Sequence, residues 1–182
     1  MIRPAAEEAV AQTKNLKVGV IATQATVSSQ AYDSAIKRLN QKVSVFSQAC
    51  PLLVPFVEEG VLNGELLEPV LRRYLKPLMK HRIDTLILGC THYPLLRNAI
   101  QKIVGKRVKL IDSAPAAVGK LIEILNRKGS IRLKKKGLLQ VFVSDLPRNF
   151  LTIGSRFLGE PLNDVKVVRF KTKVTVNGKW TV

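Results

Sequence analysis

The sequence predicts an α/β fold, in which a mostly parallel sheet is covered by helices on both faces. Two observations predict this fold: short runs rich in β-branched residues alternate with helical segments along the chain, and the first run, at residues 18–23, reads as a buried strand, as in a parallel sheet covered on both faces. The length of 182 residues is enough to bury a sizeable core and fits one large domain or two small ones.

Six apolar runs have the length and composition of strands. The first reads Val-Gly-Val-Ile-Ala-Thr, and the second alternates apolar and polar residues. The strands are expected over residues 18–23, 43–47, 83–89, 108–112, 139–144 and 165–170.

The segments between these runs repeat apolar residues at helical spacing. In the longest of them, proline is tolerated at position 69 in the first turns, whereas Pro77 is expected to kink or split the helix. The helices are expected over residues 28–40, 65–82, 94–104, 114–127 and 148–158.

The last twelve residues, 171–182, leave two interpretations open. Apolar residues alternate around Asn177-Gly178, which is a hairpin signal. The segment could equally be a disordered extension.

Composition excludes several classes of protein. The chain is 46% hydrophobic with 11 Gly and 9 Pro, which excludes collagen-like and low-complexity sequences. No apolar run is long enough to span a membrane, so no membrane partner is expected. The first residues resemble neither a signal peptide nor a transit peptide. The two cysteines, Cys50 and Cys90, are too few for a disulfide scaffold, and a reducing cytoplasm is the simplest location.

The net charge of +17 is concentrated in the second part of the chain. Residues 1–100 carry a balance of +4 and residues 101–182 a balance of +13. Such a surface can bind nucleic acid or acidic membranes, but it can also serve an anionic substrate or reflect a basic proteome. The densest run, residues 132–136, contains no aromatic residue for base stacking, which favours a solvated loop over a nucleic-acid site.

Polar residues at the carboxyl ends of the strands are the candidate site, because ligands of open parallel sheets bind there. Cys90 follows a buried strand and precedes a helix, and such a helix start favours a thiolate and lowers the cysteine pKa. His92 could polarise this thiol or deliver a proton. A buried structural cysteine is the alternative, and the Cys-Thr-His cluster at residues 90–92 makes the two readings about equal.

Three further residues are candidates with structural alternatives. The hydroxyl groups of Thr23 and Thr26 could bind a carboxylate, although helix capping by Thr26 or the serines after it explains this turn equally well. Glu58 could orient His92, or it could simply be an acid near a helix start. Cys50 is interpreted as structural. Neither cysteine belongs to a Cys-x-x-Cys pair, so the pattern supports no metal site.

Taken together, these segments closely resemble glutamate racemase, a member of the aspartate/glutamate racemase superfamily. The most diagnostic string is Gly-Cys-Thr-His-Tyr-Pro at residues 89–94. The likeness covers almost the whole chain, fades after about residue 170, and is carried by residues 19–32, 49–58, 88–96, 111–113, 143–145 and 157–159.

The resemblance implies a cytoplasmic isomerase that supplies D-glutamate for peptidoglycan and therefore for the cell wall and cell shape. In this family two cysteines act on opposite faces of the α-carbon of glutamate without a cofactor, and homodimers are common. Cys90 matches the second catalytic cysteine. His92 matches the assisting histidine, Glu58 its associated carboxylate, and Thr23, Thr26 and Thr91 match substrate-binding positions.

One part of the family pattern has no counterpart in this sequence. The first catalytic cysteine of the family lies in a Cys-Asn-Thr segment of the N-terminal lobe, which opens with an Asp-Ser pair. The resemblance therefore predicts an N-terminally truncated racemase that is inactive on its own. It predicts a complete α/β lobe over residues 1–113 and the returning part of the other lobe over 114–182, with an apolar face left open. A non-catalytic remnant and a basic nucleic-acid-binding module are the alternatives.

Overall fold

The fold is described from a computed structural model of the chain. It consists of two compact units, residues 1–131 and residues 132–182. The described residues are 2–131, 139–145, 150–163, 165–169, 173–174 and 180–181. The basic run at residues 132–136 and the Asn177-Gly178 pair lie outside these ranges.

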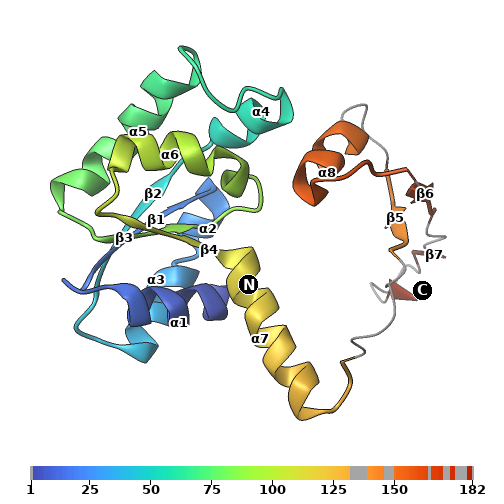
Figure 1. The fold of residues 1–182 in the computed structure, drawn as a ribbon, viewed down its shortest axis with the longest axis horizontal. Helices are drawn as coiled ribbons and strands as arrows, with labels where there is room; N and C mark the ends of the chain where they lie inside the picture. Colours follow the sequence, from blue (N-terminus) through green and yellow to red (C-terminus); the bar gives the residue numbers. More distant parts are fainter. Residues whose placement is uncertain are drawn as a thin grey trace. The chain divides into compact units, whose positions relative to one another are not determined.

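The first unit is built on a four-stranded sheet that is parallel, as predicted, and has the strand order β2-β1-β3-β4 (Figure 1). The strands are close to those expected, and β1 and β3 are the most continuous in apolar residues. They comprise β1 (Lys17–Ala22), β2 (Ser44–Ala49), β3 (Thr85–Leu88) and β4 (Lys109–Asp112).

Helices cover both faces of this sheet, which also confirms the prediction. Figure 1 shows α5 and α6 on one face and α1 and α3 on the other. The side chains of β3 alternate accordingly, because Leu86 and Leu88 face the first group and Ile87 faces the second. The helices are α1 (Ile2–Gln12), α2 (Gln24–Ser28), α3 (Ala31–Leu39), α4 (Leu53–Glu58), α5 (Leu67–Lys80), α6 (Arg97–Val104) and α7 (Ser113–Arg127), with a 3₁₀ turn η1 (Tyr93–Leu96) before α6.

Three local expectations need correction. The helix expected over residues 28–40 is divided into α2 and α3, because Gln30 adopts a left-handed backbone conformation with φ of 51°. Pro77 does not split α5, and it lies on the exposed side of that helix, where water can reach the carbonyl left without a donor. Helix α1 has no counterpart among the expected elements, because its buried face is made only of alanines.

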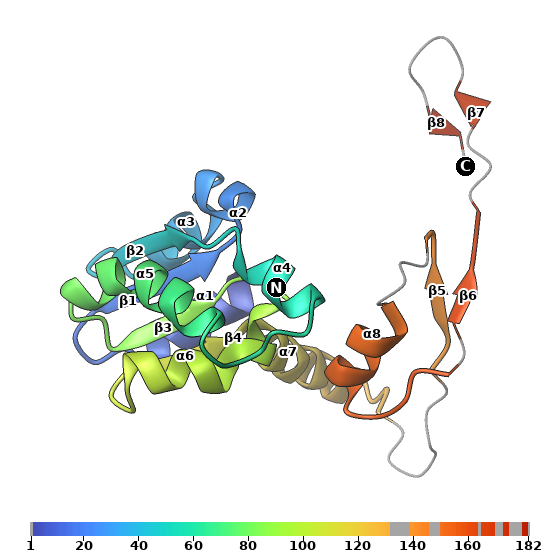
Figure 2. The same cartoon turned by 90° about the horizontal axis from the view of Figure 1, so that it is seen from above.

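The second unit contains short elements. A parallel pair joins β5 (Val141–Val143) to β6 (Val165–Val167), with α8 (Phe150–Leu158) between them in sequence, as Figure 2 shows. The pair β7 (Lys173–Val174) and β8 (Trp180–Thr181) is antiparallel, which agrees with the hairpin interpretation of the tail. No helix among the described residues is long and apolar enough to cross a membrane.

Candidate functional site

The candidate site lies at the carboxyl edge of β1 and β3. Ile21 pairs with Leu88 in the parallel register, and the Gly89 amide donates to the Ile21 carbonyl over 2.8 Å. A Cβ atom at position 89 would lie 2.9 Å from that carbonyl oxygen and 2.9 Å from the Tyr32 ring. Glycine is therefore required for the close approach. Because β1 and β3 are parallel neighbours, Thr23 and Cys90 both follow strand ends at the same edge of the sheet.

Four of the six expected site residues, Glu58, Cys90, Thr91 and His92, are brought together here. Helix α4 ends at Glu58, and the other three residues occupy the turn between β3 and η1. His92 Nε2 lies 2.6 Å from Glu58 Oε1, and Nδ1 of the same ring lies 3.9 Å from Cys90 Sγ. Thr91 Oγ1 lies 3.3 Å from that Nδ1. The chain thus folds a carboxylate, an imidazole and a thiol into one continuous row.

This row can hold a proton in two ways. When the imidazole of His92 is neutral and donates its Nε2 proton to Glu58, the Nδ1 lone pair is left to accept from the Cys90 thiol. When the imidazole is charged, both ring nitrogens donate, and the Glu58 carboxylate neutralises the charge. Cys90 is half-buried, so its sulfur is neither enclosed in the core nor freely solvated. The arrangement is suited to removing and returning a proton on a molecule bound at the sheet edge.

Thr23 and Thr26 hold the neighbouring turn together. Thr23 is the N-cap of α2, with its hydroxyl accepting from the Thr26 amide over 3.4 Å, and the two hydroxyl oxygens lie 3.0 Å apart. Capping is therefore present, although Thr23 performs it and not Thr26 or the serines after it. The hydroxyl of Thr26 thus lies next to that of Thr23, at the same edge of the sheet as Cys90. Their role as substrate ligands stays a prediction.

The other cysteine is in a different environment. Cys50 is completely buried, and burial raises the pKa of its thiol to about 12. The hydroxyl of Tyr93 donates to the Cys50 carbonyl over 2.9 Å and so joins this segment to the turn that follows Cys90. These contacts agree with the structural interpretation of Cys50, because a thiol with this pKa stays protonated at neutral pH.

Tyr32 lies near Cys90 and receives no chemical role from the sequence, whereas Ser113 is a polar residue at the end of a predicted strand. Tyr32 on α3 is 4% exposed, its hydroxyl is near Ser113, and its ring lies against Gly89. Burial raises the pKa of Tyr32, the side chain of Ser113 opposes this, and the nearby Cys90 adds to it. Ser113 is also buried at the first residue of α7. The signal in the sequence was weak, because an aromatic residue in an amphipathic helix reads first as core.

Among the described residues, no group of three His, Cys, Asp or Glu side chains is placed to hold a metal ion.

Comparison with known proteins gives consistent results. Residues 1–121 match the family model described as Asp/Glu/hydantoin racemase. The chain is 44% identical over 174 residues to the glutamate racemase of Geobacter metallireducens and 42% identical over 169 residues to that of Chlorobaculum tepidum. These alignments cover 95% and 92% of this chain.

Solved structures agree with the sequence matches. The crystal structure of glutamate racemase from Francisella tularensis in complex with D-glutamate superposes with a TM-score of 0.84 at 34% identity. A glutamate racemase isoform from Bacillus anthracis gives 0.85 at 37%. Each superposition covers 92% of this chain and 62% of the other. The chain likewise spans only 64% and 62% of the length of the two curated relatives.

Proposed function

Because the chain belongs to the Asp/Glu/hydantoin racemase family, we propose that it carries one half of a glutamate racemase site, in which Cys90 is one of two proton-transferring groups. The observation that carries the proposal is the row from Glu58 through His92 to Cys90, with separations of 2.6 and 3.9 Å at the carboxyl edge of the sheet. The curated relatives that span this region are named glutamate racemases.

In the proposed reaction, the Cys90 thiolate removes the α-proton from one face of glutamate. His92 accepts the thiol proton to form that thiolate, while Glu58 holds the imidazole in place. The α-proton then lies on Cys90 and exchanges with solvent; when Cys90 donates a proton back to the carbanion, the thiolate forms again and takes its own proton back from His92. The hydroxyl groups of Thr23, Thr26 and Thr91 bind the substrate carboxylates. The proposed chemistry is acid–base transfer between thiols, so it uses no cofactor.

Racemisation needs a second group on the opposite face of the α-carbon, because a single base returns the proton to the face it left. The only other cysteine of the chain, Cys50, is buried and has a pKa near 12, which makes it unsuitable for this step. We therefore propose that the chain on its own exchanges the α-proton without inverting the centre. In the complete site, the substrate is glutamate and the product would be D-glutamate for peptidoglycan.

The test is proton exchange in D₂O, followed by ¹H NMR with L-glutamate and D-glutamate in separate samples. One enantiomer is expected to gain α-deuterium while the amount of the opposite enantiomer stays constant. Cys90→Ser should abolish the exchange, and His92→Gln should slow it by about 10²-fold or more, as expected for loss of a positioned acid–base group. Cys50→Ala is the matched thiol control and should leave the exchange rate unchanged in the folded protein.

Two results would contradict the proposal. One is the absence of deuterium from both enantiomers with the folded wild-type chain. The other is exchange that survives Cys90→Ser, which would place the chemistry at a different residue.

A further inference from the structure

A second feature of the first unit lies between α5 and α6 and shares no residue with the candidate site. One hollow of about 190 Å³ has an apolar floor of Leu67 and Leu71 from α5 and Ala99 and Ile103 from α6. A second hollow of about 410 Å³ is lined by Arg72, Arg73, Lys76, Met79 and the same Ile103. Ile103 lines both hollows, and Arg72 of the second is hydrogen-bonded to Glu68 of the first, so the two hollows are neighbours on the helix pair; together they are called the α5–α6 groove below.

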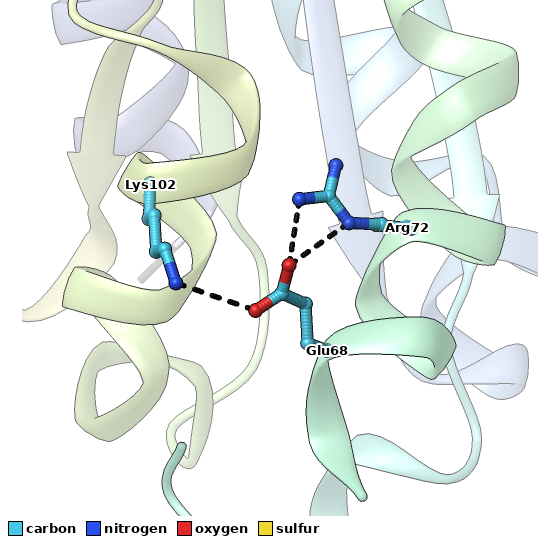
Figure 3. Close-up of polar contacts among 3 residues, drawn as sticks. All are labelled: Glu68, Arg72 and Lys102. Carbon is cyan, nitrogen blue, oxygen red and sulfur yellow. Dashed lines mark hydrogen bonds and ion pairs between the residues drawn. The ribbon is translucent and has the colours of Figure 1, made fainter. Parts of the chain in front are cut away.

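An ion triad lies in this groove. Figure 3 shows the Glu68 carboxylate between Arg72 on its own helix and Lys102 on α6. Arg72 contacts Glu68 Oε1 through Nε at 3.0 Å and Nη2 at 2.6 Å, and Lys102 Nζ lies 3.4 Å from Oε2. The hydrogen bond from Arg72, followed by that from Lys102, lowers the pKa of Glu68, so the carboxyl group is ionised at neutral pH. Both of its oxygens are already occupied.

Two further cations of the groove have no such partner. Arg73 and Lys76 are exposed and make no hydrogen bond or ion pair with any other described residue. They stand three residues apart on α5, so their side chains are neighbours on one face of the helix. Four cations against the single carboxylate of Glu68 leave the groove with a net charge of +3.

We propose that the α5–α6 groove binds a small phosphate monoester with an apolar body. The phosphate would lie between Arg73 and Lys76, because a guanidinium and an ammonium group together match its charge and acceptor oxygens. The apolar body would lie on Met79 and Ile103 and extend toward the floor of the smaller hollow. The larger hollow, at about 410 Å³, is in the range of small-molecule pockets, roughly 300–1,000 Å³, which is why the proposal concerns a small molecule.

The test uses 1-naphthyl phosphate as the probe in equilibrium dialysis with the full chain, read by naphthyl fluorescence. Inorganic phosphate and uncharged 1-naphthol are measured separately, because they represent the charged group and the apolar ring of the probe. We expect saturable binding of 1-naphthyl phosphate at least tenfold tighter than that of either half, because both parts of the groove are used.

Charge variants locate the site. The double variant Arg73→Glu with Lys76→Glu is expected to weaken binding of 1-naphthyl phosphate at least tenfold. The matched control is Arg38→Glu with Lys42→Glu, which makes the same change in net charge at exposed positions on and just after α3, on the other face of the sheet. The control should bind like the wild type. Circular dichroism checks that both variants are folded, and the neutral pair Arg73→Gln with Lys76→Gln provides a milder second version.

Several outcomes would overturn the proposal. Equal binding of 1-naphthol and 1-naphthyl phosphate would show that exposed apolar surface captures the ring. Equal loss in the two charge variants would show that only net charge matters. Tight binding to phosphatidic acid vesicles without binding of 1-naphthyl phosphate would indicate a lipid surface and not a small-molecule site.

Discussion

Helices α5 and α7 are similar in sequence pattern but differ completely in burial. Both are amphipathic, with 14 and 15 residues. Helix α5 buries Leu67, Leu71, Leu75 and Leu78 against the sheet. Helix α7 buries only Ser113 and exposes four large apolar side chains, Val118, Leu121, Ile122 and Ile124, by 43–53%. Periodicity therefore predicts a helix, whereas the neighbouring elements decide whether its apolar face is covered.

The same contrast separates the two units. In residues 2–131 the sheet has a closed apolar core on each face. Among the described residues after 131, Ile153 is the only hydrophobic side chain that is buried, and Phe142 and Val167 are more than half exposed. A two-stranded pair with one helix offers too little surface to cover them. The expected open apolar face is thus present on α7 and in the second unit, and the division into lobes at residue 113 stays a prediction.

The largest expected effect is a difference between two leucine truncations. Leu75→Ala in α5 removes a side chain that is 1% exposed, and it should lower the free energy of unfolding by about 2–5 kcal/mol. Leu121→Ala in α7, where the side chain is 52% exposed, should change it by less than about 0.5 kcal/mol. Urea denaturation followed by circular dichroism measures both. Equal losses would mean that α7 is packed in solution.

Alanine substitutions at two glycines, one in the packed sheet edge and one in the exposed helix α7, are expected to change the stability in opposite directions. Gly89→Ala introduces a Cβ 2.9 Å from a backbone oxygen and should destabilise the protein by about 1–3 kcal/mol. Gly119→Ala lies within α7 with no atom within 4 Å of the new Cβ, so it should stabilise the helix by about 0.5–1 kcal/mol. Thermal melts of the two variants check the prediction. A stabilising Gly89→Ala would contradict the close approach of β1 and the turn after β3.

In the first unit, Asp84 is expected to make the stability of the fold sensitive to acid. Burial raises the pKa of this carboxyl group, but hydrogen bonds from the Thr13 hydroxyl, the Asn15 and Lys14 amides and the Thr85 hydroxyl together hold it below 3.8. Since its folded-state pKa is depressed, its contribution is complete above about pH 4 and is lost as the pH falls through the folded-state value.

Asp84→Asn should therefore cost about 1–2 kcal/mol at pH 7, and the difference from the wild type should shrink below pH 4. Glu123→Gln on α7 is the comparison. Lys120 lowers the pKa of that fully exposed carboxyl, and a smaller change is expected because solvent screens the pair. Unfolding in urea at several pH values measures both. A constant difference between Asp84→Asn and wild type down to pH 2 would argue against a charge effect.

The smallest effect on stability is expected from the exposed face itself. Leu121→Gln with Ile122→Gln should leave the unfolding free energy within about 0.5 kcal/mol of the wild type. The same pair should reduce self-association, because it interrupts the apolar face of α7. Light scattering over a range of protein concentrations measures this, with Lys120→Gln as the control on the same helix. A wild-type chain that stays monomeric at all concentrations would disagree with the prediction.

Much of the candidate site could be predicted from the positions of the strand ends in the sequence. Apolar runs located β1 and β3, and a parallel sheet collects the residues after such strands at one edge, so Thr23 and the turn at residues 90–92 could be placed together. The distance between Glu58 and His92 could not be obtained in this way. It depends on how α4 packs against η1, and 34 residues separate the two side chains in the sequence.

The sequence by itself determined the class of fold, the order of its elements and the chemical types at the sheet edge, because hydrophobic period and strand-end position are local properties. Only the tertiary structure decided the rest. The left-handed Gln30 divides a helix, and Tyr32 reaches Ser113 and covers Gly89. Arg73 and Lys76 have no partner among the described residues and lie beside a filled ion triad. The contact between Tyr32 and Gly89, for example, joins segments that are distant in the sequence, and no local pattern specifies it.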